Sequence, residues 1–144
     1  MKIELISIVL AFATVPSTVF SQSIYFGYPG EGQKLKKGDL IILNVPKNLH
    51  GRFEETEQIT SLVKFIDSNS SVEIKIALNV FLESAEYDKD LSESLAESLQ
   101  KILDKQCKKM TYSLIAEGRS NPLFLSKESP LFRKMNTRME ILIE

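Results

Sequence analysis

Very few residues of this chain could carry out chemistry. The sequence has one cysteine, Cys107, and one histidine, His50. The usual zinc sites need several such ligands, and an intrachain disulfide needs two cysteines, so both are excluded. The lysines near Cys107 could lower the pKa of its thiol, but no base or CxxC partner accompanies it, so we interpret it as a free structural thiol. We interpret His50 as a solvated loop residue.

Acidic residues give no clearer sign of catalysis. Glu83, Glu86 and Asp88 lie close together in the sequence, and we interpret them as an exposed helix start. The chain has no Gly-rich phosphate loop, no Ser/His/Asp order and no paired-carboxylate motif. The sequence therefore predicts a protein that is not an enzyme, with no metal and no cofactor.

Charge also narrows the range of partners. Eighteen Lys and Arg residues against nineteen Asp and Glu residues give a net charge of -1 over 144 residues. Nucleic-acid binding needs a basic face, so it is not expected. Four lysines gather near the end of one predicted helix, and we interpret them as a solvated surface that could alternatively contact anionic wall or lipid head groups. They are Lys101, Lys105, Lys108 and Lys109.

The N-terminus is typical of a secretory leader. Lys2 precedes an uncharged apolar stretch over residues 5–15, and Pro16 then interrupts it. Val19 and Ser21 fit the small-residue positions of a cleavage site, so residues 1–21 are the predicted signal peptide. The alternative is an uncleaved anchor, but a span needs about 20 apolar residues. No cysteine lies near the cleavage site, which excludes a lipoprotein, and the mature protein has no predicted transmembrane span.

Behind the leader we expect an N-terminal arm or linker over residues 22–37 and one domain over residues 38–144. In that domain, segments whose apolar residues alternate as in a strand are interspersed with segments whose apolar residues have helical spacing. Val72, Ile74, Ile76, Leu78 and Val80 alternate with mostly polar residues, as in a half-buried strand.

Helical spacing appears in two other segments. Their apolar stripes are Ile59/Leu62/Val63/Ile66 and Leu91/Leu95/Leu99/Ile102. The predicted elements are strands over 40–45, 72–80, 111–116 and 139–143, helices over 54–67 and 86–105, and a loop or short helix over 119–135. This order implies an α+β two-layer sandwich, with two helices on one face of a small mixed sheet.

Three local patterns carry a family resemblance. Glu86-Tyr87, Leu91-Ser92 and Ala96 are similar to a "YN..LS..RA" helix start, and Gly118 with Pro122 is similar to a "GyGe..P" turn. The segment 136–141 resembles "NRRVEI". Together these resemble the OmpA-like domain, the peptidoglycan-binding module of peptidoglycan-associated lipoproteins and of the flagellar stator protein MotB. The resemblance covers residues 38–144.

The resemblance also implies where the ligand would bind. The family holds diaminopimelate, which bears an ammonium and a carboxylate, with an acid ending a "GHTD" strand and the arginine of "LS..RA". The acid position is Val80, or Phe81 if the strand alternation is followed, and the arginine position is Leu95. Leu95 is expected in the core. Val80 and Phe81 would extend the core or line a dry apolar pocket.

Other family positions have changed as well. Asp88 stands where the family has an asparagine, and Thr137 replaces the first arginine of "NRRVEI". Asn136 and Arg138 are retained and are the candidate remnant ligand contacts. Arg138 could equally be a surface ion-pair partner, and Asn136 could cap or turn the backbone.

The resulting hypothesis is an exported, non-catalytic cell-envelope protein, periplasmic, outer-membrane-associated or secreted. Its OmpA-like domain would have a structural or protein-interaction role, with peptidoglycan binding weakened or lost. Partners would be other envelope proteins or, weakly, peptidoglycan. Two alternatives stay open: a functional peptidoglycan-binding module, and a secreted interaction module unrelated to the wall.

Overall fold

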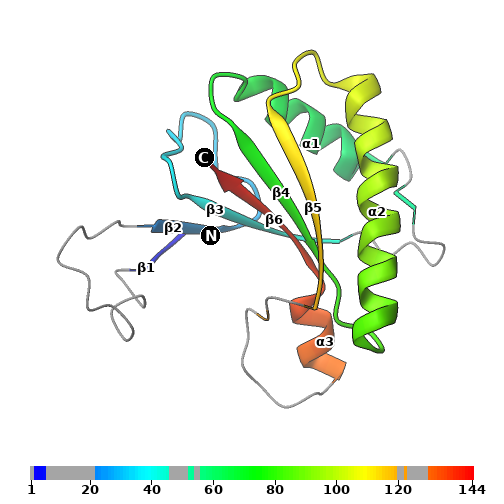
Figure 1. Cartoon of the computed structure of the whole chain (residues 1–144). Coiled ribbons are helices and arrows are strands. Elements are labelled where there is room, and N and C mark those ends of the chain that lie inside the picture. The colour runs from blue at the N-terminus through cyan, green and yellow to red at the C-terminus, as the bar shows by residue number, and fades with distance from the viewer. Residues whose placement is uncertain (1, 6–21, 46–51, 54–55, 120–121, 123–129) are drawn as a thin grey trace.

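The computed structural model describes residues 2–5, 22–45, 52–53, 56–119, 122 and 130–144 (Figure 1). These residues form three strands, after which helices and strands alternate. The elements are β1 (Lys2–Leu5), β2 (Gln22–Phe26), β3 (Leu40–Asn44), α1 (Glu57–Ser68), β4 (Ile74–Asn79), α2 (Ala85–Gln106), β5 (Tyr112–Gly118), α3 (Pro130–Asn136) and β6 (Arg138–Ile143).

The strands form one mixed sheet in the order β1-β2-β3-β6-β4-β5. β2 is parallel to β3, and β4 is parallel to β5. β6 runs antiparallel to both β3 and β4. The last strand of the chain therefore lies in the middle of the sheet, where it joins the N-terminal strands to the β4–β5 pair.

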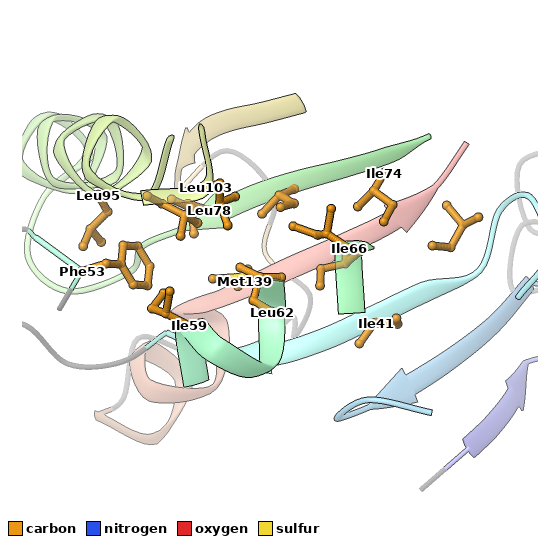
Figure 2. Close-up of a cluster of buried hydrophobic side chains, with 14 of the residues drawn as sticks. Ile41, Phe53, Ile59, Leu62, Ile66, Ile74, Leu78, Leu95, Leu103 and Met139 are labelled. Atoms are coloured by element: carbon orange, nitrogen blue, oxygen red, sulfur yellow. The ribbon is translucent and has the colours of Figure 1, made fainter. Parts of the chain in front are cut away.

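The core lies between one face of the sheet and the helices α1 and α2 (Figure 2). Alternate residues of β4 and β6 point into it because side chains alternate along a strand. The buried strand positions are Ile41, Ile74, Ile76, Leu78, Met139, Ile141 and Ile143. The predicted α+β two-layer sandwich, with helices packed on a mixed sheet, is confirmed.

Helix α1 covers the middle of this face. It buries Ile59, Leu62 and Ile66, while Val63 is half-buried. At its end, Asn69 closes the last turn: its backbone N–H and its side-chain amide both donate to the carbonyl of Phe65, at 3.1 and 2.8 Å. The predicted helix over 54–67 thus begins three residues later, and residues 54–55 lie outside the described part.

Helix α2 begins at a capping serine, because the hydroxyl of Ser84 accepts a hydrogen bond from the Tyr87 N–H at 3.2 Å. Its buried face differs from the predicted one. Leu91 and Ile102 are only half-buried, and the fully buried stripe starts with two polar residues. That stripe consists of Asp88, Ser92, Leu95, Leu99 and Leu103.

The segment expected to be an irregular arm differs from its prediction at one end. Residues 22–26 form β2, and Tyr25 is buried in the core. The following residues are irregular, as expected, but they cover part of the core: the ring of Tyr28 lies 5.1 Å from the ring of Phe65 on α1. In the segment expected to be a leader, Lys2–Leu5 forms β1, and residues 6–21 lie outside the described part.

Near the C-terminus, β5 continues two residues beyond the predicted strand, and α3 occupies the end of the segment expected as a loop or short helix. Among the described helices, none combines the length and the apolar character needed to cross a membrane.

Replacing Leu99 tests this packing. Leu99 is completely buried, so Leu99→Ala should lower the free energy of unfolding by about 2–5 kcal/mol, measured by urea denaturation. Lys101→Ala, at an exposed position of the same helix, is the control and should change it by less than about 0.5 kcal/mol. Equal small effects would contradict the packing of α2 on the sheet.

Candidate functional site

The two residues at the acid position of the family lie just after β4, where the chain leaves the sheet. Val80 is 1% exposed and Phe81 is 5% exposed. The Val80 N–H donates to the carbonyl of Gly118 at 2.8 Å, and the Phe81 N–H donates to the hydroxyl of Thr137 at 3.0 Å. The backbone here is fixed by β5 and by the start of β6, and both side chains are turned away from water.

Leu95, at the arginine position, is 3% exposed and belongs to the same core cluster as Val80. Figure 2 shows its side chain extending from α2 into that cluster, near Phe53 and Leu78. A core position is therefore confirmed for Leu95 and Val80. A charged ligand could reach these side chains only by displacing core residues.

A cavity of about 550 Å³ is present elsewhere in the described part of the chain. It lies between β3 and α1, and none of Val80, Phe81 and Leu95 lines it. Its walls are mainly apolar, with Phe26, Tyr28 and Phe53 among them. The position of the family's ligand and the position of this cavity are therefore different.

Asp88 is the most unexpected residue near the positions that the resemblance assigns to a ligand, because its side chain is completely buried. Oδ1 accepts hydrogen bonds from the backbone N–H groups of Leu82 and Glu83, at 3.0 and 3.1 Å. The interpretation of Asp88 as part of an exposed helix start is wrong, although Glu83 and Glu86 are exposed. Helical periodicity is the reason: Asp88 lies on the face of α2 that also bears Ser92, Leu95 and Leu99.

The other carboxylate oxygen of Asp88 binds Arg119. Oδ2 is 2.7 Å from Nε and 2.6 Å from a terminal guanidinium nitrogen. The guanidinium carbon also lies 5.9 Å from the ring centroid of Phe81, within reach of a cation–π contact. Sequence reasoning missed Arg119, whose only signal is its place directly after Gly118. The positive charge of Arg119 and the negative charge of Asp88 thus neutralise each other within the chain.

Gly118 and Ser92 hold β5 against α2 at the same end of the sheet. The hydroxyl of Ser92 accepts from the Gly118 N–H at 3.0 Å and donates to the carbonyl of Lys89 at 2.8 Å. Gly118 has a φ of +54°, and a Cβ there would lie 3.1 Å from the Cα of Lys89. Only glycine combines this backbone conformation with so close an approach. These two motif residues therefore have a structural role here.

Asn136 and Arg138, the retained residues of the closing signature, are both buried, with exposed fractions of 0% and 3%. The Arg138 side chain donates from Nε to Glu140 at 2.8 Å and from Nη1 to the carbonyl of Asn136 at 3.0 Å. A second guanidinium nitrogen also binds Glu140. Arg138 thus forms an ion pair, as one of the two interpretations expected, but it is buried and not at the surface. A ligand-binding role for Asn136 and Arg138 stays a prediction.

The polar surroundings of Arg138 include Asn79, which is opposite it in the β4–β6 register. Asn79 is completely buried, and among the described residues its side-chain amide has no hydrogen-bond partner. We have no physical account of this unpaired amide.

Cys107 follows the last turn of α2, where its N–H donates to the carbonyl of Leu103 at 2.8 Å. Burial, together with the negative charges of Asp67 and Asp104, raises the pKa of the thiol to about 11. The expectation that neighbouring lysines could lower this pKa is therefore wrong, and at neutral pH the thiol is protonated. The four lysines of the cluster are exposed, as expected, and His50 lies outside the described residues.

Substitutions of Asp88 test the buried ion pair. Asp88→Ala removes the buried carboxylate that pairs with Arg119 and accepts from two loop N–H groups, so it should cost about 3–5 kcal/mol of unfolding free energy in urea denaturation. Asp88→Asn should cost clearly less, because the amide oxygen can still accept from the Leu82 and Glu83 N–H groups. Equal losses of unfolding free energy for both variants would show that the hydrogen bonds from Leu82 and Glu83 add nothing to stability.

Comparison with known proteins identifies the fold. No protein-family model and no curated protein matches the sequence. The C-terminal domain of MotB from Helicobacter pylori is similar in structure, with a TM-score of 0.58 at 18% identity, over 72% of this chain and 83% of that chain.

Two further solved structures agree. The peptidoglycan-associated lipoprotein from Burkholderia pseudomallei has a TM-score of 0.55 at 15% identity, over 72% of this chain and 89% of that chain. A MotB-like protein from Desulfovibrio vulgaris has a TM-score of 0.54 at 16% identity, over 71% of this chain and 69% of that chain. The chain has the OmpA-like fold.

Proposed function

We propose that this protein is an exported, non-catalytic component of the cell envelope whose OmpA-like domain has a structural or protein-interaction role. Its hold on peptidoglycan by the mechanism that the resemblance implies is weakened or lost. The observation that carries this proposal is the burial of Val80, Phe81 and Leu95 at the positions where a zwitterionic ligand would need an acid and an arginine.

The expected loss of affinity follows from the missing groups. A hydrogen bond to a charged group contributes about 1.5–3 kcal/mol, so losing two such contacts costs about 3–6 kcal/mol. That loss weakens binding by about two to four orders of magnitude. The apolar side chains add a desolvation cost for any charged group that enters.

The neighbouring charges do not replace the lost ones. Asp88 is 0% exposed and already accepts from Leu82, Glu83 and Arg119. Arg119 is held between that carboxylate and the ring of Phe81. Using either group for a ligand would first require this ion pair to be broken.

A non-catalytic role is supported by the residues that are present. Among the residues that the structure describes, no group of three or more His, Cys, Asp and Glu side chains could hold a metal ion. The one thiol has a raised pKa, which makes it a poor nucleophile. The protein would therefore act through its surface.

Co-sedimentation with purified peptidoglycan tests the proposed loss of wall binding. We expect the protein to stay in the supernatant, because the two charge-assisted contacts are absent. Sedimentation that free diaminopimelate competes away would contradict this proposal and favour the alternative of a functional peptidoglycan-binding module. Failure to sediment, together with recovery outside the envelope fractions, would instead favour a secreted module unrelated to the wall.

A pair of substitutions that introduces the two missing charges makes this test more specific. Val80→Asp with Leu95→Arg restores the two charges at the positions that the resemblance assigns, and any binding regained should be competed by diaminopimelate. The matched control, Val80→Asn with Leu95→Gln, places polar but uncharged side chains at the same buried positions. Circular dichroism identifies which variants are folded, and the wild-type result stands independently of both.

Removal of the leader is a separate prediction, motivated by Val19, Ser21 and the short apolar stretch before them. Cleavage after Ser21 would leave Gln22 as the new N-terminus. Intact-mass and N-terminal peptide mass spectrometry of the protein recovered from the envelope fraction would measure this. A membrane-held species that still begins with Met1 or Lys2 would contradict cleavage and favour the anchor.

A further inference from the structure

The outer edge of the sheet is occupied by the strand that lies in the leader. β1 pairs antiparallel with β2, at one end of the sheet (Figure 1). In this register Ile3 is opposite Ile24, with Lys2 opposite Tyr25 and Glu4 opposite Ser23. Removing residues 1–21, as proposed above, takes β1 away and leaves β2 as the edge strand.

The backbone of β2 shows which groups would then lose their partners. The N–H of Gly27 donates to the carbonyl of Ile42, and the N–H of Ser23 donates to Asp39, so both point towards β3. Backbone groups alternate between the two sides of a strand. The N–H and C=O groups of Ile24 therefore point towards β1, opposite Ile3, and they lose this partner once β1 is gone.

This edge has none of the usual protection against pairing. Natural edge strands are commonly shielded by charged residues, by proline or by a bulge. β2 has the sequence Gln-Ser-Ile-Tyr-Phe, with no charge and no proline. It also borders an apolar area on the sheet face opposite the helices, because the register places its residues beside apolar ones of β3 and β6. That area consists of Ile24, Phe26, Leu40, Ile42 and Leu142.

We propose that, in the processed protein, β2 pairs antiparallel with β2 of a second copy, with Ile24 opposite Ile24 across a two-fold axis. This inference rests on the leader removal in the proposed function. The copy would give the N–H and C=O groups of Ile24 a new partner in place of Ile3. It would also place an isoleucine where Ile3 lies in the full chain, so the pair that β1 makes is reproduced by β2 itself.

The symmetry of this pairing explains why a second copy fits the edge. An antiparallel pair of identical strands is isologous, so one contact satisfies both edges and assembly stops at two chains. The apolar areas of the two copies become continuous across the new pair, with Ile24 beside Ile24 and Phe26 beside Gln22. The Ile24–Ile24 pair is a cross-strand pair of apolar residues, which stabilises a sheet.

Disulfide trapping tests the proposal. Cysteine is introduced by Ile24→Cys in a Cys107→Ser background, and the processed protein is purified from the envelope fraction and oxidised. Directly opposite residues of an antiparallel pair have Cα atoms about 4.5–5.5 Å apart, within the range that a disulfide spans. We expect a covalent dimer on non-reducing gels. Ser113→Cys in the same background is the matched control, exposed on the opposite edge strand, and should give little dimer.

Two further measurements complete the test. The unmodified processed protein should change from one to two chain masses with rising concentration in analytical ultracentrifugation. The full-length chain, retained in the cytoplasm, should stay at one chain mass because β1 covers the edge. Mass spectrometry of each sample first establishes its N-terminus. A processed protein that is monomeric throughout, or that cross-links equally at positions 24 and 113, would overturn the dimer while leaving the proposed leader removal intact. An uncleaved leader would overturn both the leader removal and the dimer.

Discussion

The sheet of this protein depends on the pairing of its last strand. β6 hydrogen-bonds to β3 on one side and to β4 on the other, and no other strand joins the N-terminal group to the β4–β5 pair in the described structure. Its buried residues Met139, Ile141 and Ile143 belong to the same core cluster as the buried residues of both helices. The helices can cover a continuous face only once β6 is in place. The core therefore forms from contacts that are distant in sequence, which makes them costly in chain entropy to establish.

The same strand organises the polar end of the sheet. Arg138 begins β6 and binds Glu140 and the carbonyl of Asn136, while Thr137 accepts the N–H of Phe81 from the loop after β4. On the other side of that loop, Asp88 accepts from Leu82 and Glu83 and pairs with Arg119. The loop is thus fixed from both sides by buried polar groups. In the OmpA-like family this region is expected to hold a ligand, whereas here the charged groups bind one another.

Several features of this arrangement follow from local sequence. The alternation over residues 72–80 predicts β4, and the spacing of Ile59, Leu62 and Ile66 predicts α1. An element that buries one face has apolar residues at regular intervals along its sequence. The motifs around Ser92, Gly118 and Asn136 indicate the OmpA-like fold, and the solved structures support it. The burial of Leu95 also follows from its place between Leu91 and Leu99. By contrast, Gln22–Phe26 has no clear alternation or turn signal of its own, and its strand structure comes from pairing with β3.

The sequence by itself determined the local elements, the shortage of catalytic residues and the apolar side chains at positions 80 and 95. Tertiary structure decided the roles of the polar residues. Asp88, Arg119 and Cys107 are all chemically able to face water, and nothing in their neighbours along the chain shows otherwise. Asp88 finds its partner Arg119 at a distance of 31 residues along the chain. The pKa of Cys107 is raised by burial and by the negative charges of Asp67 and Asp104. A side chain's solvation and its local field depend on what surrounds it in space, and only the folded chain brings those surroundings together.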